Sequence, residues 1–185
     1  MNLNLSIKSI RAITNGQFID TAEIGESSSI KNIVIDSRSP IIGDKTVFIL
    51  FNGNKLDGAN FIADFGEKGG KCIVTDHFIS TTTLSQIIVK DTLRALQAIA
   101  KHHRQQFTIP VIGITGSNGK TTVKEWLYAT LKDRFMIVRS PKSYNSQIGV
   151  ALSVLELSEQ HTLAIFEAGI SQVDEMAHLQ GMIQP

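Results

Sequence analysis

The stretch GITGSNGKTT, residues 113–122, constrains the fold of this chain more than any other part of its sequence. Its first residues complete a β-branched run, 111–115, that predicts a strand, and an apolar helical pattern begins directly after it. A strand, a glycine-rich loop and a helix in this order are typical of phosphate-binding units in parallel α/β sheets. The usual loop pattern, G-x-x-x-x-G-K-[ST], begins with a glycine where this sequence has Ile114.

The loop nevertheless has the residues that phosphate binding requires. Gly116 and Gly119 allow successive backbone N–H groups to converge on an anion, and a helix start adds unpaired N–H groups and a favourable dipole. Lys120 is then expected to reach the β- and γ-phosphates of a nucleotide, and the Thr121 hydroxyl is expected to bind Mg²⁺. An ordinary glycine-rich turn between a strand and a helix is the alternative interpretation.

An acidic partner for this loop stands at the end of another predicted strand. The segment TLAIFEAG, residues 162–169, runs from mostly apolar residues straight into Glu167. Ligands of α/β folds bind at the carboxyl edge of the sheet, so Glu167 is a candidate Mg²⁺ ligand together with Thr121. The alternative is a carboxylate that only ends an exposed strand. The nearby DEMAH lacks the two histidines of a metal-binding helix and is expected to be solvated.

After Pro110 the apolar pattern predicts strands that alternate with helices, which indicates a parallel α/β sheet. Three strands are expected, at 111–115, 135–138 and 162–166. The helix after the loop is expected to pack through Val123, Trp126, Leu127 and Leu131. A second helix within 145–157 is expected to turn Ile148, Leu152 and Leu155 inward, and a third begins within 171–179.

The residues before Pro110 predict a separate, smaller α/β domain. Its strands are expected at 33–35, 47–51, 72–75 and 86–89. Helices are expected from Ile7 to Ile13 after Ser6, around 61–65, and from Asp91 onward. His102 and His103 stand at the basic end of the last of these helices, where they are expected to be solvated. The predicted fold is therefore a small N-terminal α/β domain, residues 1–108, followed by an incomplete phosphate-loop sheet with flanking helices, residues 109–185.

Composition excludes several classes of partner. Eighteen Lys and Arg balance seventeen Asp and Glu, whereas proteins that bind nucleic acid or anionic membranes usually carry a basic excess. The longest apolar run, VFILF, is too short to span a bilayer, and no signal peptide is recognisable at the start. The single cysteine, Cys72, lies in the apolar segment CIVT and is expected to be a buried structural thiol. These features predict a cytoplasmic protein without membrane insertion or nucleic-acid binding.

The variant loop start points to one family. TGSNGKTT after a strand resembles the ATP loop of the Mur ligases, in which T-G-[ST]-N-G-K-[ST] replaces the usual first glycine. Further stretches resemble the MurF-type ligases of that family, and together they cover nearly the whole chain: IDSRSPIIGDKTVFILFNGNKLDGANFI (35–62), VKDTLRALQAIA (89–100), TTVKEWL (121–127), IGVALSVLEL (148–157) and IFEAGISQVDEM (165–176).

This resemblance implies an ATP- and Mg²⁺-dependent amide ligase of peptidoglycan precursor synthesis. ATP would phosphorylate the terminal carboxylate of a UDP-N-acetylmuramoyl-tripeptide. The amine of D-alanyl-D-alanine would then attack the acyl phosphate and release phosphate. The resemblance also implies that residues 1–108 bind the UDP end of the substrate and that residues 109–185 form the first part of the central ATP-binding domain.

The resemblance also implies roles for individual residues. The ATP loop would consist of Thr115, Gly116, Ser117, Asn118, Gly119, Lys120, Thr121 and Thr122. Lys120 and Glu167 would be catalytic, with Thr121 and Glu167 at the metal. Substrate would contact Asp36, Ser37, Arg38, Asn145 and Ser146, and more loosely Asn52, Gly53, Asp57 and Gly58. A guanidinium suits a diphosphate, although Arg38 could equally hold its own loop through Asp36.

The sequence departs from the family pattern at four positions. Ser146 replaces the second of two paired asparagines, which puts one substrate contact in doubt. The other three departures are Ala151 for a proline, Ala168 for a methionine and Asp174 for a glycine. None of the four removes a predicted phosphate or metal ligand.

Three other functions remain open on the sequence. They are another ATP-dependent amide ligase, of the MurE type or similar to folylpolyglutamate synthase, a small-molecule kinase, and a nucleotide-binding module without turnover. With only three predicted strands in its second part, the 185-residue chain is expected to be a piece of a longer ligase that does not make the amide bond by itself.

Overall fold

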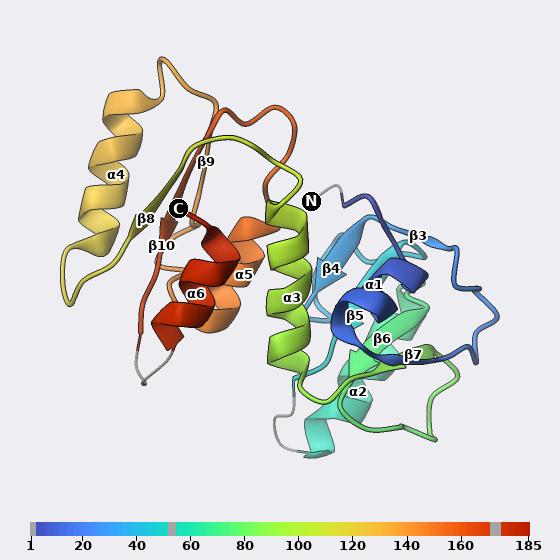
Figure 1. The fold of residues 1–185 in the computed structure, drawn as a ribbon. Coiled ribbons are helices and arrows are strands. Elements are labelled where there is room, and N and C mark those ends of the chain that lie inside the picture. The colour runs from blue at the N-terminus through green and yellow to red at the C-terminus, as the bar shows by residue number, and fades with distance from the viewer. Residues whose placement is uncertain (1–2, 52–54, 171–174) are drawn as a thin grey trace. The chain divides into compact units, whose positions relative to one another are not determined.

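A computed structural model describes residues 3–51, 55–170 and 175–185 of the chain, with the backbone alone for residues 55–59. The chain divides into two compact units, Met1–Ala95 and Leu96–Pro185, and the division falls inside helix α3 (Thr92–Arg104). Both units combine a largely parallel sheet with helices (Figure 1). The structure therefore confirms the predicted α/β class.

The first unit contains a five-stranded sheet in the order β2-β7-β6-β5-β4. Its neighbours from β4 to β7 are parallel, and β2 joins the edge antiparallel to β7. The five strands are β2 (Gln17–Ile19), β4 (Asn32–Val34), β5 (Thr46–Ile49), β6 (Cys72–Thr75) and β7 (Ser85–Ile88). The four predicted strands are confirmed. Three further short strands were not predicted: β2 and the antiparallel pair β1 (Leu5–Ser6) and β3 (Ser29–Ile30).

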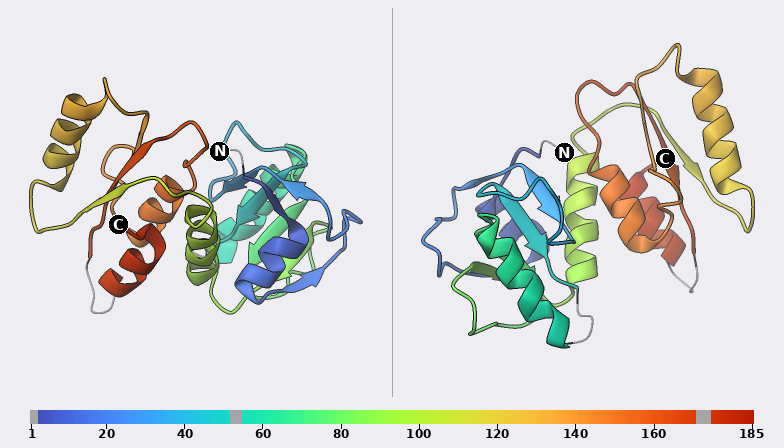
Figure 2. Two further views of the ribbon diagram at one scale, coloured as in Figure 1. Left: turned by 45° about the horizontal axis from the view of Figure 1, so that its top comes forward. Right: turned by 180° about the vertical axis from the view of Figure 1, so that it is seen from behind.

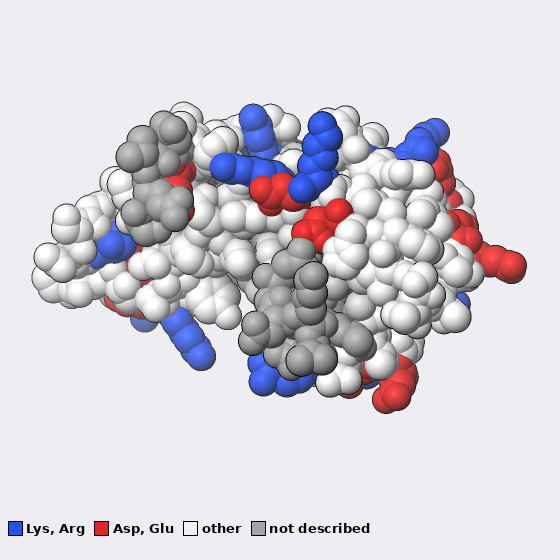
Figure 3. Space-filling model, turned by 90° about the horizontal axis from the view of Figure 1, so that it is seen from below, with Lys and Arg blue, Asp and Glu red and all other residues white. Residues whose placement is uncertain are grey.

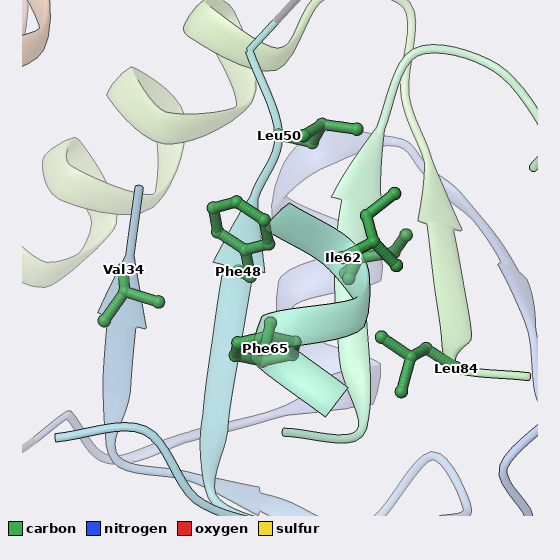
Figure 4. Packing of buried hydrophobic residues seen from close by; sticks show 7 residues of the cluster. Val34, Phe48, Leu50, Ile62, Phe65 and Leu84 are labelled. Atoms are coloured by element: carbon green, nitrogen blue, oxygen red, sulfur yellow. The ribbon is translucent and has the colours of Figure 1, made fainter. Parts of the chain in front are cut away.

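Helix α2 (Lys55–Glu67) packs its apolar side on this sheet (Figure 4). The rings of Phe48 on β5 and Phe65 on α2 lie 5.3 Å apart, centroid to centroid, and Phe65 is completely buried. The chain then passes so close to Phe65 that a Cβ on Gly70 would lie 2.3 Å from its ring. Glycine at this position therefore permits a contact that any other residue would prevent.

Local signals define helix α1 (Ile7–Thr14), as the sequence predicted. The hydroxyl of Ser6 accepts a hydrogen bond from the backbone N–H of Ser9 at 3.1 Å, which satisfies one of the unpaired donors at the helix start. At the other end Asn15 adopts a left-handed conformation, with φ of 51°, and ends the helix.

Cys72 on β6 is also buried as predicted, and burial raises the pKa of its thiol to about 12.

The second unit contains a three-stranded parallel sheet in the order β8-β10-β9. Its strands are β8 (Val111–Ile114), β9 (Ile137–Arg139) and β10 (Leu163–Glu167). Helix α4 (Lys120–Leu131) covers one face, and helices α5 (Gln147–Val154) and α6 (Glu175–Ile183) cover the other (Figures 1 and 2). The alternation of strand and helix is as predicted, but β9 begins two residues later than expected. Its pairing with β10 starts at Ile137, and Phe135 and Met136 before it are exposed.

The predicted packing faces of two helices are partly wrong. On α4, Leu127 and Leu131 pack against the sheet, but Val123 and Trp126 are exposed, Trp126 by 70%. On α5, Leu155 is buried as expected at the helix end, whereas Ile148 and Leu152 are only partly buried. The buried side of α5 contains Val150, Ala151 and Val154 instead, because α5 is covered by both β10 and α6.

The basic end of α3 is not uniformly solvated, which corrects another expectation. His102 is exposed, but His103 is buried and one ring nitrogen, Nε2, lies 2.9 Å from the carbonyl oxygen of Leu157. Burial lowers the pKa of His103 below its ordinary value. The next residue, Arg104, is also buried and donates to the carbonyl oxygens of Ile183 and Gln184. The two side chains therefore connect α3 to the segments that end α5 and α6.

Candidate functional site

The predicted phosphate loop connects β8 to α4, as the sequence indicated. Gly116 and Gly119 have φ angles of 137° and 76°, in the region that residues with a side chain rarely adopt. Gly119 occupies the position that caps the start of α4, and no side chain caps the helix there. The loop residues 115–119 are exposed. The free N–H groups at the start of a helix favour a bound anion at this position.

Lys120 lies at the first position of α4 and folds back over the loop. Its Nζ donates to the carbonyl oxygen of Gly116 at 2.7 Å. The ammonium group therefore already lies beside the loop whose N–H groups would face a phosphate. A phosphate oxygen would be a stronger, charge-assisted acceptor than this carbonyl.

Thr121 and Glu167 meet at the carboxyl edge of the sheet. Glu167 is the last residue of β10, the central strand, and is paired in register with Ile114 at the end of β8. The hydroxyl of Thr121 donates to Oε2 of Glu167 at 3.0 Å. The structure thus brings together the two residues that the sequence proposed as metal ligands, although they are far apart in the chain.

A buried lysine that the sequence analysis did not single out completes this cluster. Nζ of Lys124 lies 2.8 Å from Oε1 of Glu167, and neither side chain has any solvent-exposed surface. Lys124 also donates to the carbonyl oxygens of Ser140 and Lys142. The sequence offers one weak signal, which is that Lys124 lies one helical turn after Lys120 and one turn before Leu127, a residue of the predicted packing face.

The loop between β9 and α5, residues 140–146, packs against the same strand end. The hydroxyl of Ser140 accepts from the backbone N–H of Glu167 at 3.0 Å. The carbonyl oxygen of Asn145 accepts from the N–H of Gly169 at 2.8 Å, and a Cβ on Gly169 would lie only 2.9 Å from that oxygen. Ser146, the other predicted substrate residue here, caps α5 by accepting from the N–H of Gly149 at 3.2 Å.

The candidate substrate residues of the first unit follow β4. Arg38 donates through Nε and one terminal nitrogen to the carboxylate of Asp36, with the closest contact at 2.6 Å. These hydrogen bonds, followed by the one from the backbone N–H of Arg38, lower the pKa of Asp36 to about 2. The contact supports the alternative in which Arg38 holds its own loop, but 82% of the Arg38 side chain is exposed and can meet a ligand.

The remaining predicted substrate residues of this unit provide less information. Ser37 is buried, and its carbonyl oxygen accepts from Nζ of Lys68 at 2.7 Å. Asn52 and Gly53 lie outside the described residues. Asp57 and Gly58 lie in the first part of α2, residues 55–59, for which the structure describes the backbone alone.

Two general observations concern charge and membranes. On the face shown in Figure 3, basic and acidic side chains lie interspersed among neutral ones, in line with the balanced composition. Within the described part of the chain, the helices are too short or too polar to cross a bilayer.

Comparison with known proteins identifies the relatives of this chain. Residues 114–185 match the family model of the Mur ligase middle domain. The chain is 37% identical over 187 residues to the UDP-N-acetylmuramoyl-tripeptide–D-alanyl-D-alanine ligase of Synechocystis sp., covering 100% of this chain and 41% of the relative. It is 32% identical to the ligase of the same name from Bacillus subtilis, covering 86% of this chain and 35% of that relative.

Solved structures give the same result. MurF from Acinetobacter baumannii superimposes with a TM-score of 0.87 at 27% identity, over 100% of this chain and 40% of that one. The MurF ligase from Thermotoga maritima in complex with ADP superimposes with a TM-score of 0.71 at 28% identity, over 82% of this chain and 35% of that one. The resemblance seen in the motifs is confirmed, and the chain spans about two fifths of the length of these relatives.

Proposed function

We propose that this chain, which belongs to the Mur ligase family, supplies the phosphate loop and the UDP-substrate region of a MurF-type ligase. The observation that carries the proposal is the contact between Thr121 and Glu167 at the edge of the sheet. It places a hydroxyl and a carboxylate beside a glycine loop at a helix start, which is the set of groups that nucleotide phosphates require.

The loop binds the phosphates of ATP in this proposal. N–H groups of residues 115–121 surround the phosphates, and the Lys120 ammonium exchanges the carbonyl of Gly116 for phosphate oxygens. These groups are fixed before the reaction, so they stabilise the charge that shifts on the γ-phosphoryl group without further rearrangement. The ADP complex of the Thermotoga relative supports nucleotide binding in this fold.

The cluster also fits a Mg²⁺ ion that arrives with the nucleotide. Such an ion takes one or two protein oxygens and completes its shell with phosphate oxygens and water. Thr121 and Glu167 would hold it, and the ion would neutralise charge on the phosphates. Among the described residues, no group of three or more His, Cys, Asp or Glu side chains could hold a metal ion.

The reaction proposed is amide-bond formation in the cytoplasm. The terminal carboxylate of UDP-N-acetylmuramoyl-tripeptide attacks the γ-phosphorus of ATP, ADP leaves, and an acyl phosphate forms. The amine of D-alanyl-D-alanine then displaces phosphate and gives up a proton. Residues 1–108 bind the UDP end of this substrate, with Arg38 on a phosphate, and residues 109–185 form the first part of the ATP-binding domain. Holding carboxylate and phosphate in line supplies much of the rate.

Phosphate release by the full-length parent protein tests the proposal. Release should require ATP, UDP-tripeptide and D-alanyl-D-alanine together, whereas the 185-residue chain should bind ligands without multiple turnovers. Release that requires a different amine would indicate another amide ligase, and release without any amine would indicate a kinase or an ATPase. An Arg38→Ala variant should lose affinity for the UDP-substrate and keep its affinity for ATP.

A further inference from the structure

We propose that Lys124 is a positioning residue of the phosphate site, which holds the Glu167 carboxylate and the 140–146 loop in one arrangement. This inference rests on the proposed function, because it concerns how Glu167 is presented to Mg²⁺ and ATP. It goes further by assigning a role to a side chain that is too deeply buried to contact either ligand in this structure.

The Lys124 ammonium has buried partners from three segments. It donates hydrogen bonds to the carbonyl oxygens of Ser140 and Lys142, and it forms an ion pair with Glu167, whose Oε1 lies 2.8 Å from Nζ. A second carboxylate, that of Glu125, lies 3.4 Å from Nζ and is itself paired with Arg139. A buried charge is costly unless it is paired and hydrogen-bonded, so this arrangement fixes the ammonium in one place.

The two oxygens of Glu167 are consequently used differently. Oε1 is bound to the buried Lys124, while Oε2 accepts from Thr121, an exposed residue of the phosphate loop. The carboxylate cannot rotate without breaking one of these contacts. Lys124 therefore keeps Oε2 turned toward the position where a nucleotide-bound ion would lie. Loss of a group that orients a metal ligand typically lowers metal affinity.

The backbone of the 140–146 loop shows the same constraint. Lys142 has a φ of 50°, a left-handed conformation that is unfavourable for a residue with a side chain. The carbonyl oxygen of this residue is one of the acceptors of Lys124. Strained backbone of this kind persists where surrounding contacts hold it. Because Lys124 contacts both this loop and Glu167, it couples the loop to the carboxylate. The same loop continues to Asn145 and Ser146, the candidate substrate residues.

The test measures ATP affinity of the 185-residue chain by calorimetry, with Mg²⁺ and with EDTA. The variant Lys124→Met keeps the length of the side chain and removes its charge. We expect it to lose roughly 10–100-fold in affinity with Mg²⁺, the range for residues that orient a metal ligand, and to change little in EDTA. Lys132→Met, which removes an exposed lysine at the end of the same helix, is the matched control and should behave as the parent.

Two outcomes would overturn the inference, and they are distinguishable. A folded Lys124→Met chain with the parent's Mg²⁺-dependent affinity would overturn the role of Lys124 alone. If the ATP affinity of the unmodified 185-residue chain does not depend on Mg²⁺, the proposed function is overturned as well.

A second measurement needs no variant, in case Lys124→Met does not fold. In the ¹⁵N-lysine-labelled parent, the Nζ signal of Lys124 should shift when Mg²⁺ and ATP are added together and much less with ATP alone. An unchanged signal at saturating Mg²⁺ and ATP would contradict the proposal.

Discussion

Helices α2 and α4 both pack on a sheet, but they bury opposite kinds of side chain. In the first unit α2 buries Phe65 against the ring of Phe48. In the second unit α4 buries Lys124, which pairs with Glu167. An apolar ring gains stability from burial itself, whereas a buried ion pair returns little for the cost of removing two charges from water. Under the proposed function, the first contact serves stability and the second serves the proposed phosphate site.

Removing one member of the buried pair should have the largest effect on stability. Lys124→Ala leaves the Glu167 carboxylate buried without its partner, so we expect the free energy of unfolding to fall by about 3–5 kcal/mol. Urea denaturation measures this change. The double variant Lys124→Met/Glu167→Gln removes both charges and should recover much of the loss. Parent-like stability of Lys124→Ala would mean that the pair is not buried as described.

Loss of the partly buried Lys120 should affect binding rather than folding. Lys120→Ala removes a charged hydrogen-bond donor from the phosphates, so ATP affinity should fall by about 1.5–3 kcal/mol, or roughly 10–100-fold. Unfolding in urea should change little because Lys120 lies outside the core. Equal ATP affinity in the variant and the parent, measured by calorimetry, would contradict the phosphate-loop assignment.

In the first unit, stability should be sensitive to the added volume of a side chain rather than to the loss of a charge. In Gly70→Ala the new methyl group meets the ring of Phe65, so we expect a loss of about 1–3 kcal/mol in stability from overpacking. Gly43→Ala is the matched control, since a Cβ there has no neighbour within 4 Å and should cost much less. If both variants unfold at the same urea concentration, the close packing around Phe65 is not as described.

The smallest effect is expected on the outer side of α4. Trp126 is 70% exposed, so Trp126→Ala should change the free energy of unfolding by no more than about 0.5 kcal/mol. A tryptophan in a core would cost about 3–5 kcal/mol on the same substitution. A large loss in the free energy of unfolding, measured by urea denaturation, would therefore indicate that Trp126 packs in the core, as the sequence predicted.

Features with local causes were predictable from the sequence. The helix after Ser6, the strand CIVT and the strand–loop–helix unit at residues 113–122 each depend on neighbouring residues, and each occurs where it was expected. The position of Glu167 at the end of a strand could also be predicted, because a run of mostly apolar residues leads directly into it.

Features that depend on distant parts of the chain were not predictable. Lys124 is buried because Glu167, Ser140 and Lys142 bring acceptors from other elements, and the helical pattern alone favoured Val123 and Trp126. His103 is buried for a similar reason, since its partner is the carbonyl oxygen of Leu157. Hydrophobic periodicity shows that a helix has a buried side. The partners available to its polar side chains help to decide which residues lie on that side.

A crystal structure of this chain with Mg²⁺ and a non-hydrolysable ATP analogue tests the central claim most directly. We predict that the phosphates will bind to the N–H groups of residues 115–121 and that Mg²⁺ will lie beside Thr121. The ion should contact Glu167 directly or through one water, with Lys124 still bound to the other carboxylate oxygen. Phosphates bound elsewhere, or an ion more than one water away from Glu167, would contradict the account.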